Sequence, residues 1–141
     1  MFYSRRIGRS PQFGLHIPEG SYGQAPEFTR ILGAAKITGK TAGGWSVGLL
    51  ESMTAREYAT ISTGSLEKRI PMEPFTNYAV ARVQKDFHEG NTMLGGMITS
   101  VHRKLEENDP SYLHKSAYTG GIDLVHKWDA KNWEFDLSLY G

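Results

Sequence analysis

The 141-residue sequence contains no cysteine, which excludes a disulfide scaffold and any zinc site built on thiolates. It also lacks an excess of charge of one sign, since it contains 16 Lys and Arg residues and 15 Asp and Glu residues. A nucleic-acid-binding domain normally has a clear basic excess, so this class of protein is disfavoured. The length suits one domain with a core of its own.

No apolar run approaches the roughly 20 residues that a transmembrane helix needs, and the mean hydropathy is −0.43. A chain that crosses a membrane with β-strands is not detected by the length of its apolar runs or by its mean hydropathy, because only every second residue of a strand faces lipid. A signal peptide is also lacking, because no apolar stretch follows the charges of Arg5 and Arg6. An exported protein needs such a segment, so we expect the chain to be a fragment or to lack its natural start.

What the sequence does contain is a period-two alternation of apolar and polar residues, the signature of β-strands. It runs through three pairs of segments, each pair joined by a short polar or glycine-rich turn. The segments are 31–41 and 45–54, 77–87 and 92–102, and 118–128 and 133–140. Their turns are 42–44, 88–91 and 129–132.

The sequence therefore predicts an all-β fold, an antiparallel up-and-down meander of about 6–8 strands. Residues 27–141 are expected to form three hairpins. Residues 1–26 are expected to be irregular apart from one strand at 2–8. Residues 62–76 and 106–116 are polar and contain prolines, and we expect them to be long loops between the hairpins.

Short turns that alternate with long loops are typical of outer-membrane barrels, and strands of about ten residues have the membrane-crossing length. We interpret residues 1–141 as a single section of a transmembrane β-barrel. A soluble β-rich binding module, whose apolar face packs on a core, remains the alternative. That alternative predicts buried side chains for Trp133 and Phe135.

In a membrane barrel the polar face of each strand points to the lumen and the apolar face to lipid. The predicted lumen-facing residues are Lys36, Lys40, Arg82, Gln84, Asp86, Asp123, Lys127, Glu134 and Asp136. Aromatic rings at strand ends suit the headgroup layer, and the predicted interfacial set is Trp45, Phe87, Trp128 and Trp133. Within segment 92–102, Met93 and Met97 alternate with Thr92 and Ser100, while Lys85 interrupts the apolar set of its own segment.

Two motifs suggest catalysis or nucleotide binding. Residues 44–48 match G-x-S-x-G, so a serine hydrolase acting through Ser46 is a second alternative, and it requires a helix over 49–60. Residues 39–41 resemble the end of a P-loop, but Ala34 stands where its first glycine is needed. The five histidines have no metal-ligand spacing. We predict no catalytic residue, no metal and no cofactor.

Four stretches together resemble a known family: FYSRRIGRSP (2–11), ILGAAKITGKTAGGWSVGLLES (31–52), EPFTNYAVARVQKDFHEGNTMLGGMITSVHR (73–103) and YTGGIDLVHKW (118–128). They are similar to the C-terminal domain of large envelope proteins of Gram-negative bacteria. There a carbohydrate-binding family-9-like domain precedes a domain of unknown function regarded as an outer-membrane barrel.

The resemblance implies an outer-membrane location, contact with outer-membrane lipid, and glycan binding or uptake through a neighbouring domain that this chain lacks. It implies no catalytic residues. It also implies that the remaining strands of the barrel lie outside these 141 residues.

Overall fold

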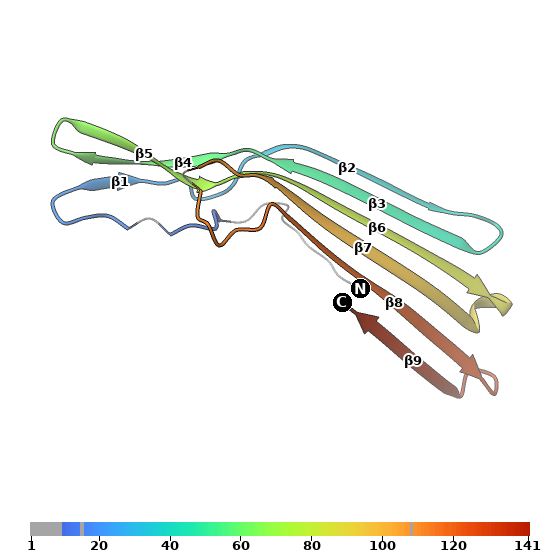
Figure 1. Cartoon of the computed structure of the whole chain (residues 1–141). Coiled ribbons are helices and arrows are strands. Elements are labelled where there is room, and N and C mark those ends of the chain that lie inside the picture. The colour runs from blue at the N-terminus through green and yellow to red at the C-terminus, as the bar shows by residue number, and fades with distance from the viewer. Residues whose placement is uncertain (1–9, 15, 108) are drawn as a thin grey trace. The chain divides into compact units, whose positions relative to one another are not determined.

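The computed structural model describes residues 10–14, 16–107 and 109–141, and this part of the chain contains strands and one short 3-10 turn but no α-helix (Figure 1). The prediction of an all-β fold is confirmed. The strands form two antiparallel sheets. They are β1 (Tyr22–Gln24), β2 (Ile31–Lys40), β3 (Trp45–Thr54), β4 (Glu57–Thr63), β5 (Leu66–Glu73), β6 (Phe75–Phe87), β7 (Thr92–Lys104), β8 (Ser116–Trp128) and β9 (Trp133–Tyr140).

The three predicted hairpins are confirmed as β2–β3, β6–β7 and β8–β9. They lie side by side in a six-stranded sheet with the order β2-β3-β6-β7-β8-β9 (Figure 1). The first turn depends on Gly44, whose φ of +80° favours glycine. A Cβ atom on Gly44 would also lie 2.8 Å from the carbonyl oxygen of Asp86. The Asp86 amide donates to the Gly44 carbonyl at 2.8 Å, which joins this turn to β6.

The prediction of a long loop over residues 62–76 is wrong, because β4 and β5 form a fourth hairpin there. Proline suggested a loop, but Pro71 lies in β5, at the edge of the three-stranded sheet β1-β4-β5, where a missing N–H is tolerated. The irregular region expected up to residue 26 also contains β1. The strand expected over residues 2–8 lies outside the described residues. The loop predicted over 106–116 is confirmed for its described residues 106–107 and 109–115, since none of them lies in a strand and β8 begins at Ser116.

The chain divides into two compact units. Unit 1 comprises residues 1–34, 52–77 and 102–115, and unit 2 comprises residues 35–51, 78–101 and 116–141. The buried apolar side chains of the described residues all belong to unit 1, and they are Ala55, Ala59, Ile61, Met72 and Pro74. In unit 2, which the structure describes completely, Gly95 alone is buried. Unit 2 is therefore a sheet without a core of its own.

Within unit 1, Arg56 and Asp109 form a nearly buried ion pair, with 12% and 1% of their side chains exposed. The two nitrogens Nη1 and Nη2 of Arg56 each donate to one carboxylate oxygen at 2.9 Å. Arg56 also donates to the carbonyl of Lys104 at 2.6 Å, and the Glu106 amide donates to Asp109 at 2.8 Å. The pair therefore attaches the connection between β7 and β8 to the start of the β4–β5 hairpin.

This pairing shifts both pKa values. The hydrogen bond with Asp109 raises the pKa of Arg56. Burial alone would raise the pKa of Asp109, but the hydrogen bonds from Arg56 and from the Glu106 amide outweigh it, so that the pKa is lowered. A carboxyl group with a lowered folded-state pKa contributes stability above its unfolded pKa of about 3.9 and loses it as the pH falls through the folded value. The pair therefore stabilises unit 1 at neutral pH and is lost only in acid.

We predict that Asp109→Ala opens the connection between β7 and β8, because breaking a buried pair costs about 3–5 kcal/mol. The rate of proteolytic cleavage after Arg103, Lys104 and Lys115 at pH 7 measures this opening. Glu106→Gln is the matched control, since the Glu106 side chain is 55% exposed. Equal cleavage rates for the two variants, or opening of the unaltered chain already at pH 6, would contradict the assignment.

Candidate functional site

One face of unit 2 carries paired charges. Lys40 Nζ lies 3.1 Å from Asp86, Arg82 lies 2.9 Å from Asp123, and Lys127 lies 2.8 Å from Glu134. All six of these residues belong to the set predicted to face a lumen. The structure therefore brings the predicted charges together as pairs on a single face, which we call the polar face.

Three further residues of the predicted set belong to the polar face. Gln84 donates to Asp86 at 3.3 Å, and the Ser138 hydroxyl donates to Asp136 at 3.4 Å. Lys36 has the parity of Lys40 along β2 and makes no ion pair with a described residue. The amide of Gln84 also donates to the sulfur of Met93 at 3.5 Å, so Met93 lies on the polar face. Its neighbour Leu94 therefore points to the opposite face.

Two glycines leave room for side chains that lie across the polar face. A Cβ atom on Gly95 would come within 2.8 Å of the Asp123 carboxylate carbon. A Cβ atom on Gly121 would collide with the ring of Tyr140 and lie 2.8 Å from the Leu139 carbonyl oxygen. These glycines allow the charged and aromatic side chains to pack flat against the strands, and in particular let β9 approach β8.

The opposite face of unit 2 is apolar and exposed. Thirteen large apolar side chains on it are each 40–61% exposed, and we call this set the apolar face. The register of β8 and β9 places Ile122 opposite Leu139 and Trp128 opposite Trp133. The set comprises Trp45, Val47, Leu49, Val83, Phe87, Leu94, Ile98, Ile122, Trp128, Trp133, Phe135, Leu137 and Leu139.

The middle of the same sheet is hollowed by an open concavity of about 760 Å³. Gly96 and Gly120 lie among its lining residues, and Arg82 is the one charged residue in that lining. Seven of the lining residues are Val47, Leu49, Val83, Ile98, Ile122, Leu139 and Ala81. Apolar residues of this lining therefore come from five neighbouring strands, β3, β6, β7, β8 and β9.

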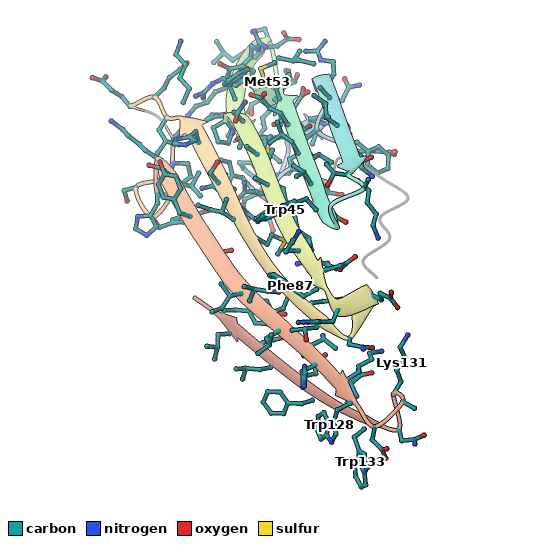
Figure 2. All side chains as sticks on the ribbon, turned by 90° about the vertical axis from the view of Figure 1, so that its right-hand side faces the viewer. Trp45, Met53, Phe87, Trp128, Lys131 and Trp133 are labelled. Atoms are coloured by element: carbon teal, nitrogen blue, oxygen red, sulfur yellow. The ribbon has the colours of Figure 1, made fainter. Side chains whose placement is uncertain are left out.

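Aromatic rings edge one end of the apolar face. Trp45, Phe87, Trp128 and Trp133 stand next to the turns of the three hairpins, as Figure 2 shows, with Trp128 and Trp133 close to the turn that carries Lys131. The imidazole of His126 stacks on Trp128 with ring centroids 5.7 Å apart. The four residues predicted as an interfacial set therefore lie at the same end of the sheet.

Lys85, which interrupts the apolar alternation of β6, lies at this aromatic end. Its ammonium group is 5.2 Å from the centre of the Trp45 ring and 5.6 Å from that of Phe87. It donates a hydrogen bond to the carbonyl of Gly43 in the first turn. The aliphatic stem of Lys85 thus covers apolar surface while its charge reaches the polar turn.

The helix that a serine hydrolase would need after Ser46 is not formed, because Trp45–Thr54 is one continuous strand and β4 follows at Glu57. The motif at residues 44–48 is a turn and the start of a strand. Among the described residues, no group of three or more His, Asp or Glu side chains could hold a metal ion. No helix in the described part of the chain is long and apolar enough to cross a membrane.

The fold and this surface define an all-β protein built around an antiparallel sheet with one polar and one apolar face. The chain belongs to the family described as Domain of unknown function (DUF5916), whose model matches residues 1–112. The match reaches from the N-terminus through β7 and ends before β8 and β9. It agrees with the sequence resemblance to a domain of unknown function. No curated protein and no solved structure matches the chain.

We predict that Gly121→Ala weakens the attachment of β9, because the new methyl group would meet both the Tyr140 ring and the backbone of Leu139. Crowding of this kind costs about 1–3 kcal/mol. Amide hydrogen exchange of β9 should therefore accelerate. Gly39→Ala is the matched control, since nothing lies within 4 Å of a Cβ atom there. Unchanged exchange in β9 of the Gly121→Ala variant would contradict this packing.

Proposed function

We propose that the chain is a non-catalytic section of the wall of a transmembrane β-barrel in the bacterial outer membrane. In this proposal the apolar face lies against lipid and the polar face lines the lumen. The observation that carries it is the exposure of thirteen large apolar side chains on one face of a unit in which Gly95 alone is buried. Lipid is the solvent that such a face suits.

Water would be a poor solvent for this face. Complete burial of a large apolar side chain contributes about 1.5–3 kcal/mol, and these side chains are about half exposed. In water, the thirteen side chains together therefore lack on the order of 10–20 kcal/mol of the stabilising free energy that complete burial would contribute. This is as much as the whole stability of an ordinary domain. A contiguous apolar surface of this kind marks a membrane or a partner contact.

The polar face supports the same arrangement. Its charges are paired at 2.8–3.1 Å within the sheet, so few charged groups would be left without a partner in a narrow lumen. At the aromatic end, amphipathic rings suit the headgroup layer, and Lys85 extends its charge past them toward the turn. Both features match a wall that separates lipid from water.

The apolar band also has a suitable height. From Tyr118 to Trp128, β8 covers ten residue steps, about 34 Å along the strand. At a strand tilt of about 40°, this corresponds to roughly 26 Å along the membrane normal, and barrels have an apolar band about 25 Å tall. β8 is therefore long enough to cross the hydrocarbon layer once.

The soluble binding module is the less favoured alternative. It requires Trp133 and Phe135 to be buried in a core, but their side chains are 61% and 49% exposed. A serine hydrolase is disfavoured by the strand that follows Ser46. The link to glycan binding or uptake is part of the proposal and is supported by the sequence resemblance to envelope proteins that carry a carbohydrate-binding family-9-like domain.

Leu137→Lys tests the proposed function. Leu137 lies four residues from Trp133, near the middle of the apolar band, where a lysine facing lipid costs about 2–4 kcal/mol. We therefore expect the equilibrium for insertion into liposomes to fall by at least about 30-fold. Flotation with liposomes and protection from added protease measure insertion.

Ser138→Lys is the matched control. Ser138 lies on the polar face, opposite Asp123 and two residues from Asp136, so a lysine there finds acidic neighbours and insertion should not change. Equal loss of insertion in both variants would contradict the assignment of the two faces. Recovery of the unaltered chain as a stable monomer in buffer without detergent would contradict the proposed function itself.

A further inference from the structure

The β4–β5 hairpin of unit 1 (Figure 1) borders an open cavity of about 470 Å³, and every residue that lines this cavity belongs to unit 1. The charged residues of the lining are three cations, Arg56, Lys68 and Arg69, and one acid, Glu106. Tyr58 supplies an aromatic ring. A cavity of this size is within the range of roughly 300–1,000 Å³ that is typical of small-molecule sites.

The positive charge of the cavity is only partly neutralised within the chain. Arg56 lies 2.9 Å from Asp109 and 3.4 Å from Glu106, so its charge is already balanced by acids. Lys68 and Arg69 form no ion pair with any residue that the structure describes. With Asp109 counted, three cations therefore meet two acids, and the excess of positive charge belongs to Lys68 and Arg69.

The guanidinium group of Arg69 is held in a defined position by an aromatic ring. Arg69 lies opposite Thr60 in the register of β4 and β5, so Tyr58 is its diagonal neighbour. The guanidinium carbon lies 4.5 Å from the centre of the Tyr58 ring. Stacking of this kind uses the flat face of the guanidinium and leaves the N–H donors at its edges unoccupied. The ring thus presents a planar fork of donors to the cavity.

In the described part of the chain, Arg69 is the only arginine whose guanidinium meets neither a carboxylate nor a backbone carbonyl. The other four each form an ion pair with an acid or donate to a carbonyl group, and they are Arg30, Arg56, Arg82 and Arg103. A positioned donor fork without an acceptor inside the chain is suited to an acceptor from outside. Such forks match the planar geometry of carboxylate and phosphate oxygens.

We propose that this cavity binds the phosphate group of a hydroxylated small molecule. The two oxygens of a carboxylate would be occupied by the fork of Arg69, whereas a phosphate has a third oxygen for the ammonium group of Lys68. The cavity is larger than a phosphate group alone, and Tyr58 and Glu106 provide hydrogen-bonding groups for neighbouring hydroxyls. A free sugar phosphate and a phosphorylated lipid headgroup share this chemistry.

Titration of the full chain in non-ionic detergent with glucose 6-phosphate tests the site, with unphosphorylated glucose as the matched ligand. Nuclear magnetic resonance of protein labelled with ¹⁵N-arginine locates the contact, and we expect the Nε–H signal of Arg69 to shift with glucose 6-phosphate but not with glucose. Calorimetry gives the affinity. Arg69→Gln should lower the association constant by about tenfold or more, because it removes charge-assisted hydrogen bonds.

Two further variants separate the donor fork from charge alone. Arg69→Lys keeps the charge but has no planar fork, so its affinity should lie between those of the unaltered chain and Arg69→Gln. Lys115→Gln removes one exposed positive charge of unit 1 outside the cavity, and it should change the affinity by no more than about twofold. The thermal unfolding midpoint, recorded for each variant, should not change, because both side chains are exposed.

Three results would overturn the proposal. These are equal affinities of Arg69→Gln and the unaltered chain, equal losses in Arg69→Gln and Lys115→Gln, and equal binding of glucose and glucose 6-phosphate. Absence of binding by any phosphate probe would overturn it as well.

A second titration, with mixed micelles that contain phosphatidic acid or phosphatidylcholine, distinguishes the two sources of the phosphate. Binding of phosphatidic acid but not of glucose 6-phosphate, with the same dependence on Arg69, assigns the site to a lipid headgroup, and the reverse assigns it to a soluble ligand. The proposal does not rest on the membrane function of unit 2. Loss of phosphate binding in Arg69→Gln leaves insertion into liposomes unchanged, and a chain that fails to insert can be titrated in buffer.

Discussion

A β-strand turns successive side chains to opposite faces, and in this chain that geometry produces two surfaces of different polarity. Unit 2 contains no second layer of its own, and Gly95 is its one buried residue. The ion pairs therefore gather on one face and the large apolar side chains on the other. The solvent that each face meets then decides whether this sheet is stable.

Some residues break the alternation of apolar and polar side chains along the strands, and the different polarity of the two faces explains their positions. Lys85 lies on the apolar face, yet its charge reaches the carbonyl of Gly43 beyond the aromatic rings. Glycines on the polar face, such as Gly121, leave space for a neighbouring side chain rather than weakening the strand. Unit 1 follows different rules, because it has a small apolar core and a nearly buried ion pair between Arg56 and Asp109.

The sequence alone predicted the three long hairpins because their signals are local, namely period-two alternation and turns such as the one at Gly44. The β4–β5 hairpin was missed because Pro71 indicates a loop unless the strand is known to be an edge. The face of Met93 depends on its contact with a neighbouring strand. The contact of Arg56 with Asp109 joins residues 53 positions apart, and no local pattern predicts it.

The most direct test of the membrane-facing surface uses the three tryptophans of the chain, Trp45, Trp128 and Trp133, which all lie at the aromatic end of the apolar face. Their fluorescence can be quenched by lipids that carry bromine at known depths in the acyl chain. Our account predicts strong quenching by bromine close to the headgroups, weak quenching by bromine at the bilayer centre, and protection from aqueous iodide. Equal quenching by iodide with and without liposomes, and none by brominated lipid, would contradict it.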